Sequence, residues 1–143
     1  MRLDAPELQL IVVKHGLEAL SDEVLADGFD DWVPISTVEG LARVRNPNGT
    51  DRVRWSDTLE VVRALVVSNL MEAGNIVSGT FVVTTETTDE WISRVDRAHE
   101  TGDHELWGYL VWLRNTDAGM QRGAEVLRRT NRLREDPKAQ NPQ

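Results

Sequence analysis

The most metal-like stretch of the chain contains two histidines, His99 and His104, separated by four residues. The carboxylates of the same stretch are Asp96, Glu100, Asp103 and Glu105. Imidazole and carboxylate ligands together suit zinc or nickel if one helix presents them on one side. The Thr101-Gly102 pair is expected to break that helix, so the spacing fixes no ligand geometry. We therefore expect a solvated helix end here, with no metal and no cofactor.

Residue types that catalyse reactions are scarce. The chain contains three His and no Cys, which excludes thiolate nucleophiles, disulfides and cysteine-ligated metals. It has neither the strand-turn-helix motif that presents a serine nucleophile nor a glycine-rich phosphate loop. Most carboxylates fall on polar faces, where they keep ordinary acidity and transfer no proton at neutral pH. The sequence therefore predicts a binding protein and not an enzyme.

Acidic residues beside large aromatic residues recur in three stretches and are the best candidates for a partner-binding surface. The seven acidic candidates are Asp27, Asp30, Asp31, Asp89, Glu90, Asp103 and Glu105. In the first stretch, Phe29 and Trp32 accompany the acids. An apolar anchor surrounded by charges is typical of a protein interface, because the charges steer a partner of opposite sign.

The alternative is that the tryptophans are core residues and the acids only solvate the starts of helices. We favour the core for Trp91 and Trp112 and leave Trp32 and Trp107 open between the two environments. Asp89 and Glu90 are also explained without a partner, because carboxylates stabilise the N-terminus of a helix.

The charge distribution indicates the sign of the partner. The net charge is −8; residues 1–115 contain twenty acidic and ten basic residues, and residues 116–143 contain four and six. An acidic body repels phosphate backbones and attracts basic proteins. The N-terminus lacks the basic-then-apolar pattern of a signal peptide, and no apolar run is long enough to cross a bilayer. We expect a cytoplasmic protein with no membrane contact and no small-molecule substrate.

Capping residues and apolar periodicity predict the elements that would position these residues. We expect a first helix from about Asp4, with a new turn at residues 21–23. A second helix should begin at a Ser36/Glu39 capping box, and a third should run from residue 56 or 57 to Gly74. Residues 76–83 and 106–113 are expected to be paired strands, with a helix inserted between them that starts at a Thr87/Glu90 capping box. Thr116 is expected to cap the final helix.

This order predicts a mainly α protein with a small β-hairpin, an α+β chain that is winged-helix-like. Leu70 followed by Gly74 resembles the end of a winged-helix recognition helix, and Leu113, Thr116 and Gly119 resemble the exit from its wing. No linker divides the chain, so residues 1–134 are predicted to form one domain, and residues 135–143 a disordered tail.

A winged helix makes a DNA-binding transcriptional regulator the alternative function. The helix that would read the groove, residues 57–73, contains Arg63 as its only base, beside Asp57, Glu60 and Glu72. Base readout needs outward hydrogen-bond donors, and phosphate contacts need several cations. The candidate phosphate contacts are Arg43, Arg45, Arg52 and Arg54, and Arg128, Arg129, Arg132 and Arg134. These arginines either hold phosphates or neutralise the acids around them.

Three segments, residues 31–35, 74–81 and 108–119, resemble a set of small actinobacterial winged-helix-like proteins. Some of that set are similar to immunity proteins of contact-dependent growth inhibition systems, which bind and neutralise a cognate toxin domain. The resemblance implies an immunity protein but assigns no functional residue. An acidic surface would suit a basic, possibly nuclease, toxin, either plugging its active site or inhibiting it from an adjacent site.

Overall fold

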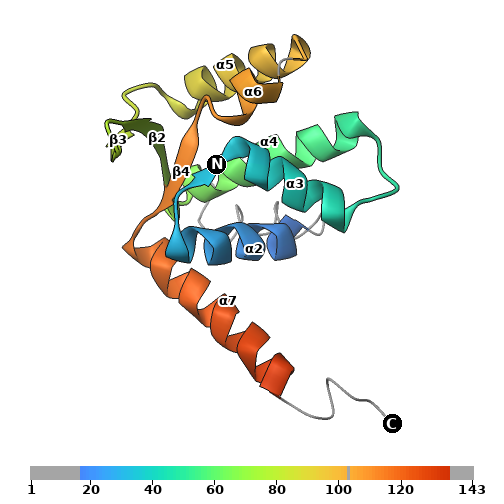
Figure 1. Ribbon diagram of the computed structural model, residues 1–143, viewed down its shortest axis with the longest axis vertical. Helices are drawn as coiled ribbons and strands as arrows, with labels where there is room; N and C mark the ends of the chain where they lie inside the picture. The colour runs from blue at the N-terminus through green and yellow to red at the C-terminus, as the bar shows by residue number, and fades with distance from the viewer. Residues whose placement is uncertain (1–16, 103, 136–143) are drawn as a thin grey trace, which may run out of the picture.

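Helices surround one face of a small antiparallel sheet in a computed structural model that describes residues 17–102 and 104–135 (Figure 1). The helices are α2 (Leu17–Asp30), α3 (Ile35–Arg45), α4 (Asp51–Val67), α5 (Thr88–Glu100), α6 (His104–Gly108) and α7 (Asp117–Glu135). The strands are β1 (Val33–Pro34), β2 (Met71–Val77), β3 (Thr80–Val83) and β4 (Trp112–Asn115). The prediction of a mainly helical α+β protein is confirmed.

The four strands pair in the order β1-β4-β2-β3, and every neighbouring pair is antiparallel. Leu113 of β4 pairs with Val33 on one side and with Ala73 on the other. Successive residues of a strand point to opposite faces of the sheet. These three residues are buried under the helices, whereas the same face is exposed farther out, in the β2–β3 hairpin. On the opposite face Trp112 and Arg114 of β4 are half-buried.

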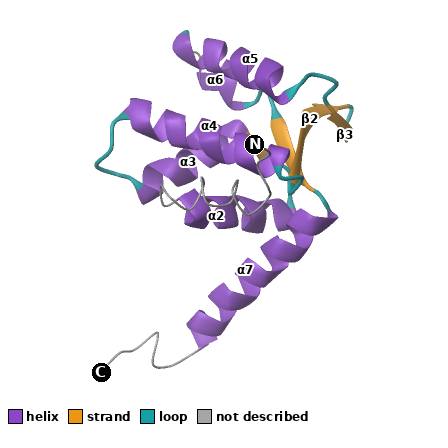
Figure 2. Cartoon of the chain, turned by 180° about the vertical axis from the view of Figure 1, so that it is seen from behind, coloured by secondary structure: helices purple, strands orange, loops and turns teal. Residues whose placement is uncertain are grey.

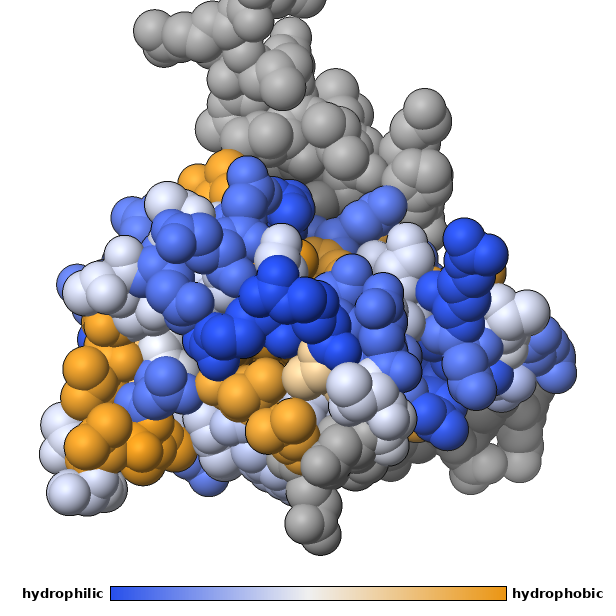
Figure 3. Space-filling model, turned by 90° about the horizontal axis from the view of Figure 1, so that it is seen from above, coloured by the Kyte–Doolittle hydropathy of each residue, from blue (hydrophilic) through white to orange (hydrophobic). Residues whose placement is uncertain are grey.

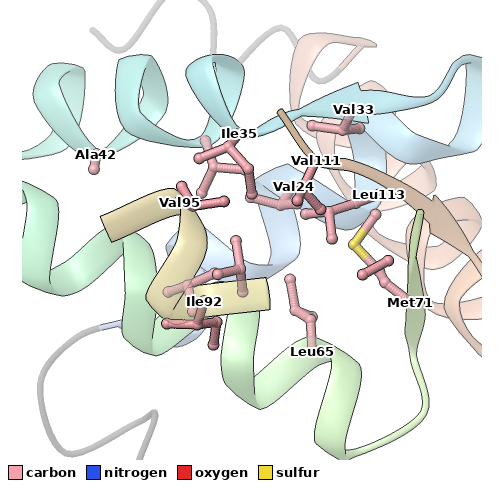
Figure 4. Close-up of a cluster of buried hydrophobic side chains, with 14 of the residues drawn as sticks. Val24, Val33, Ile35, Ala42, Leu65, Met71, Ile92, Val95, Val111 and Leu113 are labelled. Atoms are coloured by element: carbon pink, nitrogen blue, oxygen red, sulfur yellow. The ribbon is translucent and has the colours of Figure 1, made fainter. Parts of the chain in front are cut away.

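Apolar side chains from eight elements meet between the helices and the sheet, and Figure 4 shows part of this cluster. Val24 of α2, Ile35 of α3 and Val95 of α5 have no exposed surface, and Leu113 brings the sheet into the same cluster. Each side chain of this size contributes roughly 1.5–3 kcal/mol when it is fully removed from water. The contacts join residues that lie far apart in the sequence, so helices and sheet form one core.

Two helix starts differ from the prediction. Helix α4 begins at Asp51, where the Thr50 side chain accepts a hydrogen bond from Val53 N (3.2 Å), and not at residue 56 or 57. Helix α3 begins at Ile35 without a side-chain cap. The Ser36/Glu39 capping box is therefore wrong, since Glu39 is buried and pairs with Arg43.

Helix α2 also runs without a break through residues 21–23, where we predicted a new turn. Val24 and Leu25 continue its buried side, so packing against the core holds the backbone helical there. The helix ends at Asp30, which places the predicted acidic cluster in and just after its last turn. The prediction that a helix starts near Asp4 concerns residues outside the described part of the chain.

The predicted strand at residues 76–83 is two strands joined by a tight turn. Ser78 and Gly79 have φ of 51° and 77°, the left-handed values of a two-residue hairpin loop. Strand β2 starts at Met71, so the predicted helix stop at Gly74 is wrong. A side chain at position 74 would lie 2.8 Å from the Phe81 ring, and only glycine leaves room for that ring to lie over β2.

The second predicted strand, at residues 106–113, is also only partly correct. Residues 104–108 form α6, and β4 begins at Trp112 and pairs with β2 as expected. The Thr87/Glu90 capping box of α5 is confirmed. Thr116 also caps α7 as predicted, accepting a hydrogen bond from Gly119 N (3.1 Å).

Helix α7 crosses α2 and extends away from the rest of the described chain (Figures 1 and 2). The crossing is close because a Cβ at Gly123 would lie 2.5 Å from Leu25 O. The buried Asn115 amide donates to Leu25 O (2.9 Å), which ties β4 to α2 at the same point. Glu135, predicted to belong to the tail, is the last residue of α7, and residues 136–143 lie outside the described part.

Candidate functional site

Three of the predicted acidic residues, Asp27, Asp30 and Asp31, form an exposed group that we call the acidic end of α2. Within residues 17–102 and 104–135, none of the three forms an ion pair. Asp31 accepts a hydrogen bond from the backbone N–H of Trp32 (2.8 Å), which is a local turn contact. The three carboxylates therefore remain available to a partner.

The position of this group is electrostatically unfavourable. The last turn of α2 contains no basic residue, and carboxylates there meet the negative end of the helix dipole. Burial, and to a lesser extent the nearby Glu23 carboxylate, raise the pKa of Asp27. Both effects oppose the ionised form, so these charges do not contribute to holding the helix together.

Large aromatic residues on the half-buried side of the sheet adjoin the acidic end of α2. We call this surface the aromatic face; its residues are Trp32, Phe81, Tyr109 and Trp112. Trp32, directly after the acids, packs against Phe81 with ring centroids 5.8 Å apart. The Arg114 guanidinium lies 4.5 Å from the Phe81 ring centroid and pairs with Glu72 (3.1 Å).

Two of the tryptophan predictions have clear outcomes in this arrangement. Trp91 is fully buried, as predicted for a core residue. Trp112 was also predicted to be core, but it is half-buried on the outer side of β4, because its neighbour Leu113 takes the inward position. Of the two left open, Trp107 is buried and Trp32 is half-buried at the aromatic face.

The predicted site residues Asp89 and Glu90 lie elsewhere, at the start of α5. In both ribbon views α3 and α4 separate α5 from α2 (Figures 1 and 2). Asp89 pairs with Arg63 of α4, and the Glu90 side chain accepts a hydrogen bond from Thr87 N (3.0 Å). Local structure therefore accounts for both residues. Asp103 and the side chain of Glu105 lie outside the described part of the chain.

The metal-like stretch contains an aromatic cluster that the sequence did not suggest. The His99 imidazole stacks on Trp55 at 3.8 Å between ring centroids, and Trp107 meets both rings edge-on. Trp55 Nε1 donates to Asp96 Oδ1 (2.8 Å). Burial lowers the pKa of His99, although Asp96 and other nearby carboxylates oppose the shift. Among the described residues no three His, Asp or Glu side chains are grouped to hold a metal.

Most described arginines near the proposed phosphate-binding clusters face acidic partners. Arg43 pairs with Glu39, Arg45 with Glu23, and the Arg54 side chain donates to Gly49 O. On α7, Arg122 and Arg129 both contact Asp22, Arg122 at 3.1 Å and Arg129 at 3.4 Å. These pairs fit the interpretation in which the arginines neutralise the acids around them.

Comparisons of the chain with protein-family models, with curated proteins and with solved structures return no match. Within the described ranges, no helix combines the length and apolarity needed to span a bilayer.

Proposed function

We propose that this chain binds a basic protein through the acidic end of α2 and the aromatic face beside it. The observation that carries the proposal is the group of three exposed carboxylates at the C-terminal end of a helix, with no ion-pair partner in the described chain. Because this placement opposes the helix dipole, a docked basic surface would relieve a repulsion that the isolated chain retains. Of the adjacent aromatic rings, Trp32, Tyr109 and Trp112 keep exposed apolar area of the kind that anchors protein interfaces, whereas Phe81 is buried beneath them.

The biological role that best fits such a partner is that of an immunity protein acting in the cytoplasm. A toxin domain that cleaves nucleic acid needs a basic substrate channel, and an acidic surface complements that channel. In this proposal Asp27, Asp30 and Asp31 steer the toxin, while Trp32 contributes to the apolar centre of the contact. Asp89 and Glu90 belong to the structure of α5.

We also propose that the fold is winged-helix-like. Strand β1 follows the first described helix, α3 and α4 come next, and the sheet order β1-β4-β2 corresponds to the three strands of that fold. Strand β3 and helices α5 and α6 then form an insertion between β2 and β4.

This insertion favours a protein partner over DNA. Helix α5 packs along α4, the helix that would enter the groove of DNA. Asp89 of α5 forms an ion pair with Arg63 of α4, so this arginine is not free to contact a phosphate. Glu60 is exposed on the same helix and would repel phosphates. A DNA-binding regulator would need this side of α4 to be free and basic.

The test is binding to a candidate toxin, the C-terminal domain of a large exported protein encoded next to this chain. A variant with Asp27→Asn, Asp30→Asn and Asp31→Asn is compared with a matched variant, Glu60→Gln, Glu100→Gln and Glu125→Gln. Both sets are exposed and both change the net charge from −8 to −5. Association rates are measured at low and physiological salt.

We expect the first variant to associate about tenfold more slowly at low salt, because charges near the contact dominate steering. The matched variant should differ from the wild type by less than about threefold, since two of its three charges lie on α4 and α5, away from the acidic end of α2. Equal effects in the two variants would show that the association rate depends only on the net charge, and would contradict a specific role for the acidic end of α2. Tight binding that neither variant changes would contradict the proposed surface.

A further inference from the structure

Among the strands of the described residues, β3 is an edge of the sheet, since β2 is its only neighbour there in the order β1-β4-β2-β3. Proteins usually protect such edges with charges, proline or a bulge, because free backbone groups can pair with another strand. Residues 80–83, Thr-Phe-Val-Val, contain no charge and no proline. Val82 and Val83 are 49% and 43% exposed, so the edge lacks these protections and is apolar.

The pairing register shows which backbone groups face outward. Thr84 N donates to Ala73 O (2.9 Å), which makes 73 and 84 a hydrogen-bonded pair. Hydrogen-bonded and non-hydrogen-bonded pairs alternate in an antiparallel ladder, so Val82 also bonds to β2. The N–H and C=O groups of Phe81 and Val83 therefore point away from β2, toward the free edge.

We propose that β3 pairs with β3 of a second copy of this chain, forming a weak two-fold dimer. An antiparallel arrangement centred on Val82 places Phe81 of each copy opposite Val83 of the other. Each of these two pairs exchanges two backbone hydrogen bonds. The two Val82 side chains meet at the axis, so all exposed apolar side chains of the edge become partly buried.

The charges around the edge suit a second copy better than a strongly charged strand. The strand itself is neutral, and the charged residues that follow and flank it form pairs, Glu86 with Arg94 (2.6 Å) and Asp89 with Arg63. In the view from above, apolar surface gathers at the side of the molecule that holds the hairpin (left in Figure 3). The net charge of −8 still opposes association, so higher salt should strengthen the dimer.

The proposed contact leaves the acidic end of α2 free, because α2 leads into β1 at the other edge of the sheet. A contact of four residues from each copy buries less surface than a stable interface, which needs about 1,000 Å², so self-association should require high concentration. The edge shares Phe81 with the aromatic face, but self-association and toxin binding are measured separately, so each proposal can fail without the other.

Sedimentation equilibrium of the full chain, from micromolar to millimolar concentration, tests the proposal. We compare the wild type with Val82→Lys and with a matched variant, Val44→Lys, whose valine is 76% exposed on α3. Both variants change the net charge equally. The wild type should approach twice the monomer mass at high concentration, Val82→Lys should self-associate at least about tenfold more weakly, and Val44→Lys should resemble the wild type.

Amide exchange of the wild type provides a measurement that needs no variant. The amides of Phe81 and Val83 should exchange freely in dilute solution and several-fold more slowly in concentrated solution. A chain that stays monomeric throughout the range overturns the proposal. A dimer in which these two amides gain no protection, or one that both lysine variants weaken equally, overturns it as well.

Discussion

Asp27, Asp30 and Asp31 lie at the end of α2 where a carboxylate is least favourable, and no described basic side chain offsets them. Other acids of the same helix are paired, Asp22 with Arg122 and Glu23 with Arg45. The difference between paired and unpaired acids within one helix separates a structural role from a proposed binding role.

Replacing one of these unpaired acids should stabilise the chain. Asp27→Asn should raise the free energy of unfolding at pH 7 by about 0.3–1 kcal/mol, because it removes a negative charge from the helix C-terminus. The raised pKa of Asp27 means that its ionised form disfavours folding; this disadvantage is absent below its ordinary pKa and complete above its folded one. The gain should therefore shrink as the pH falls through the folded pKa of Asp27 and vanish below about 4.

The matched control for this prediction is Asp117→Asn, which removes a carboxylate from the first turn of α7. That charge favours the helix N-terminus, so its loss should lower stability by a similar amount. Urea unfolding of both variants at pH 7 measures the two effects. If both substitutions change stability in the same direction, the helix-dipole explanation is wrong.

His99 should make stability depend on pH. Because burial lowers the pKa of His99 in the folded chain, the unfolded chain binds the proton more readily. The contribution of neutral His99 is present above its ordinary pKa of about 6.5 and is lost as the pH falls through the folded value. His99→Phe keeps a ring against Trp55 but cannot titrate. Urea unfolding between pH 7.5 and 5 should show a smaller loss of stability in this variant than in the wild type. An equal loss in both proteins would contradict the role of His99.

At the scale of elements, close approaches of the backbone determine how the helices pack. Helix α7 passes so near α2 that Gly123 has no room for a side chain, and β4 is tied to α2 at the same crossing through Asn115. Gly40 on α3 provides a contrast, because a Cβ there would meet no atom within 4 Å.

Alanine at these two glycines should have opposite effects. Gly123→Ala should destabilise the chain by about 1–3 kcal/mol, since the new methyl group overlaps the α2 backbone. Gly40→Ala should stabilise it by about 0.5–1 kcal/mol, because alanine restricts the unfolded chain and favours a helix. Thermal unfolding of both variants measures the difference. If Gly123→Ala left the thermal stability unchanged, α7 would be able to move away from α2 without a loss of stability, and the explanation by close packing would be wrong.

At the scale of the whole molecule, the excess of acids and the pairing of most described arginines favour our proposal of a basic protein partner over nucleic acid. Arg45 and Arg54, which a regulator would use for phosphates, are engaged with Glu23 and Gly49 O. Long-range attraction of nucleic acid requires an excess of free cations, which the described surface does not provide.

The chain should therefore not bind duplex DNA from upstream of its own gene at physiological salt. Fluorescence anisotropy of a labelled duplex, titrated with the chain, measures this directly. Binding that Arg45→Glu or Arg54→Glu abolishes would instead support the regulator. Such a result would also show that these arginines leave their present partners.

The sequence by itself determined the features that depend on neighbouring residues. The capping box at Thr87, the cap at Thr116 and the α+β class all follow from local chemistry that a short window contains. The acidic stretch around Asp27 to Asp31 was also recognisable, because charge and aromatic composition can be read directly.

Only the tertiary structure decided which residues share a surface. Ser78 and Gly79 turn one predicted strand into a hairpin, and the pairing of β2 with β4 then assigns Leu113 to the core and Trp112 to the outer face. Packing likewise separates Asp89 from Asp27 and brings Trp55 onto His99 across more than forty residues. These outcomes depend on contacts between distant segments, and the burial of apolar area that drives those contacts is not encoded in any local pattern.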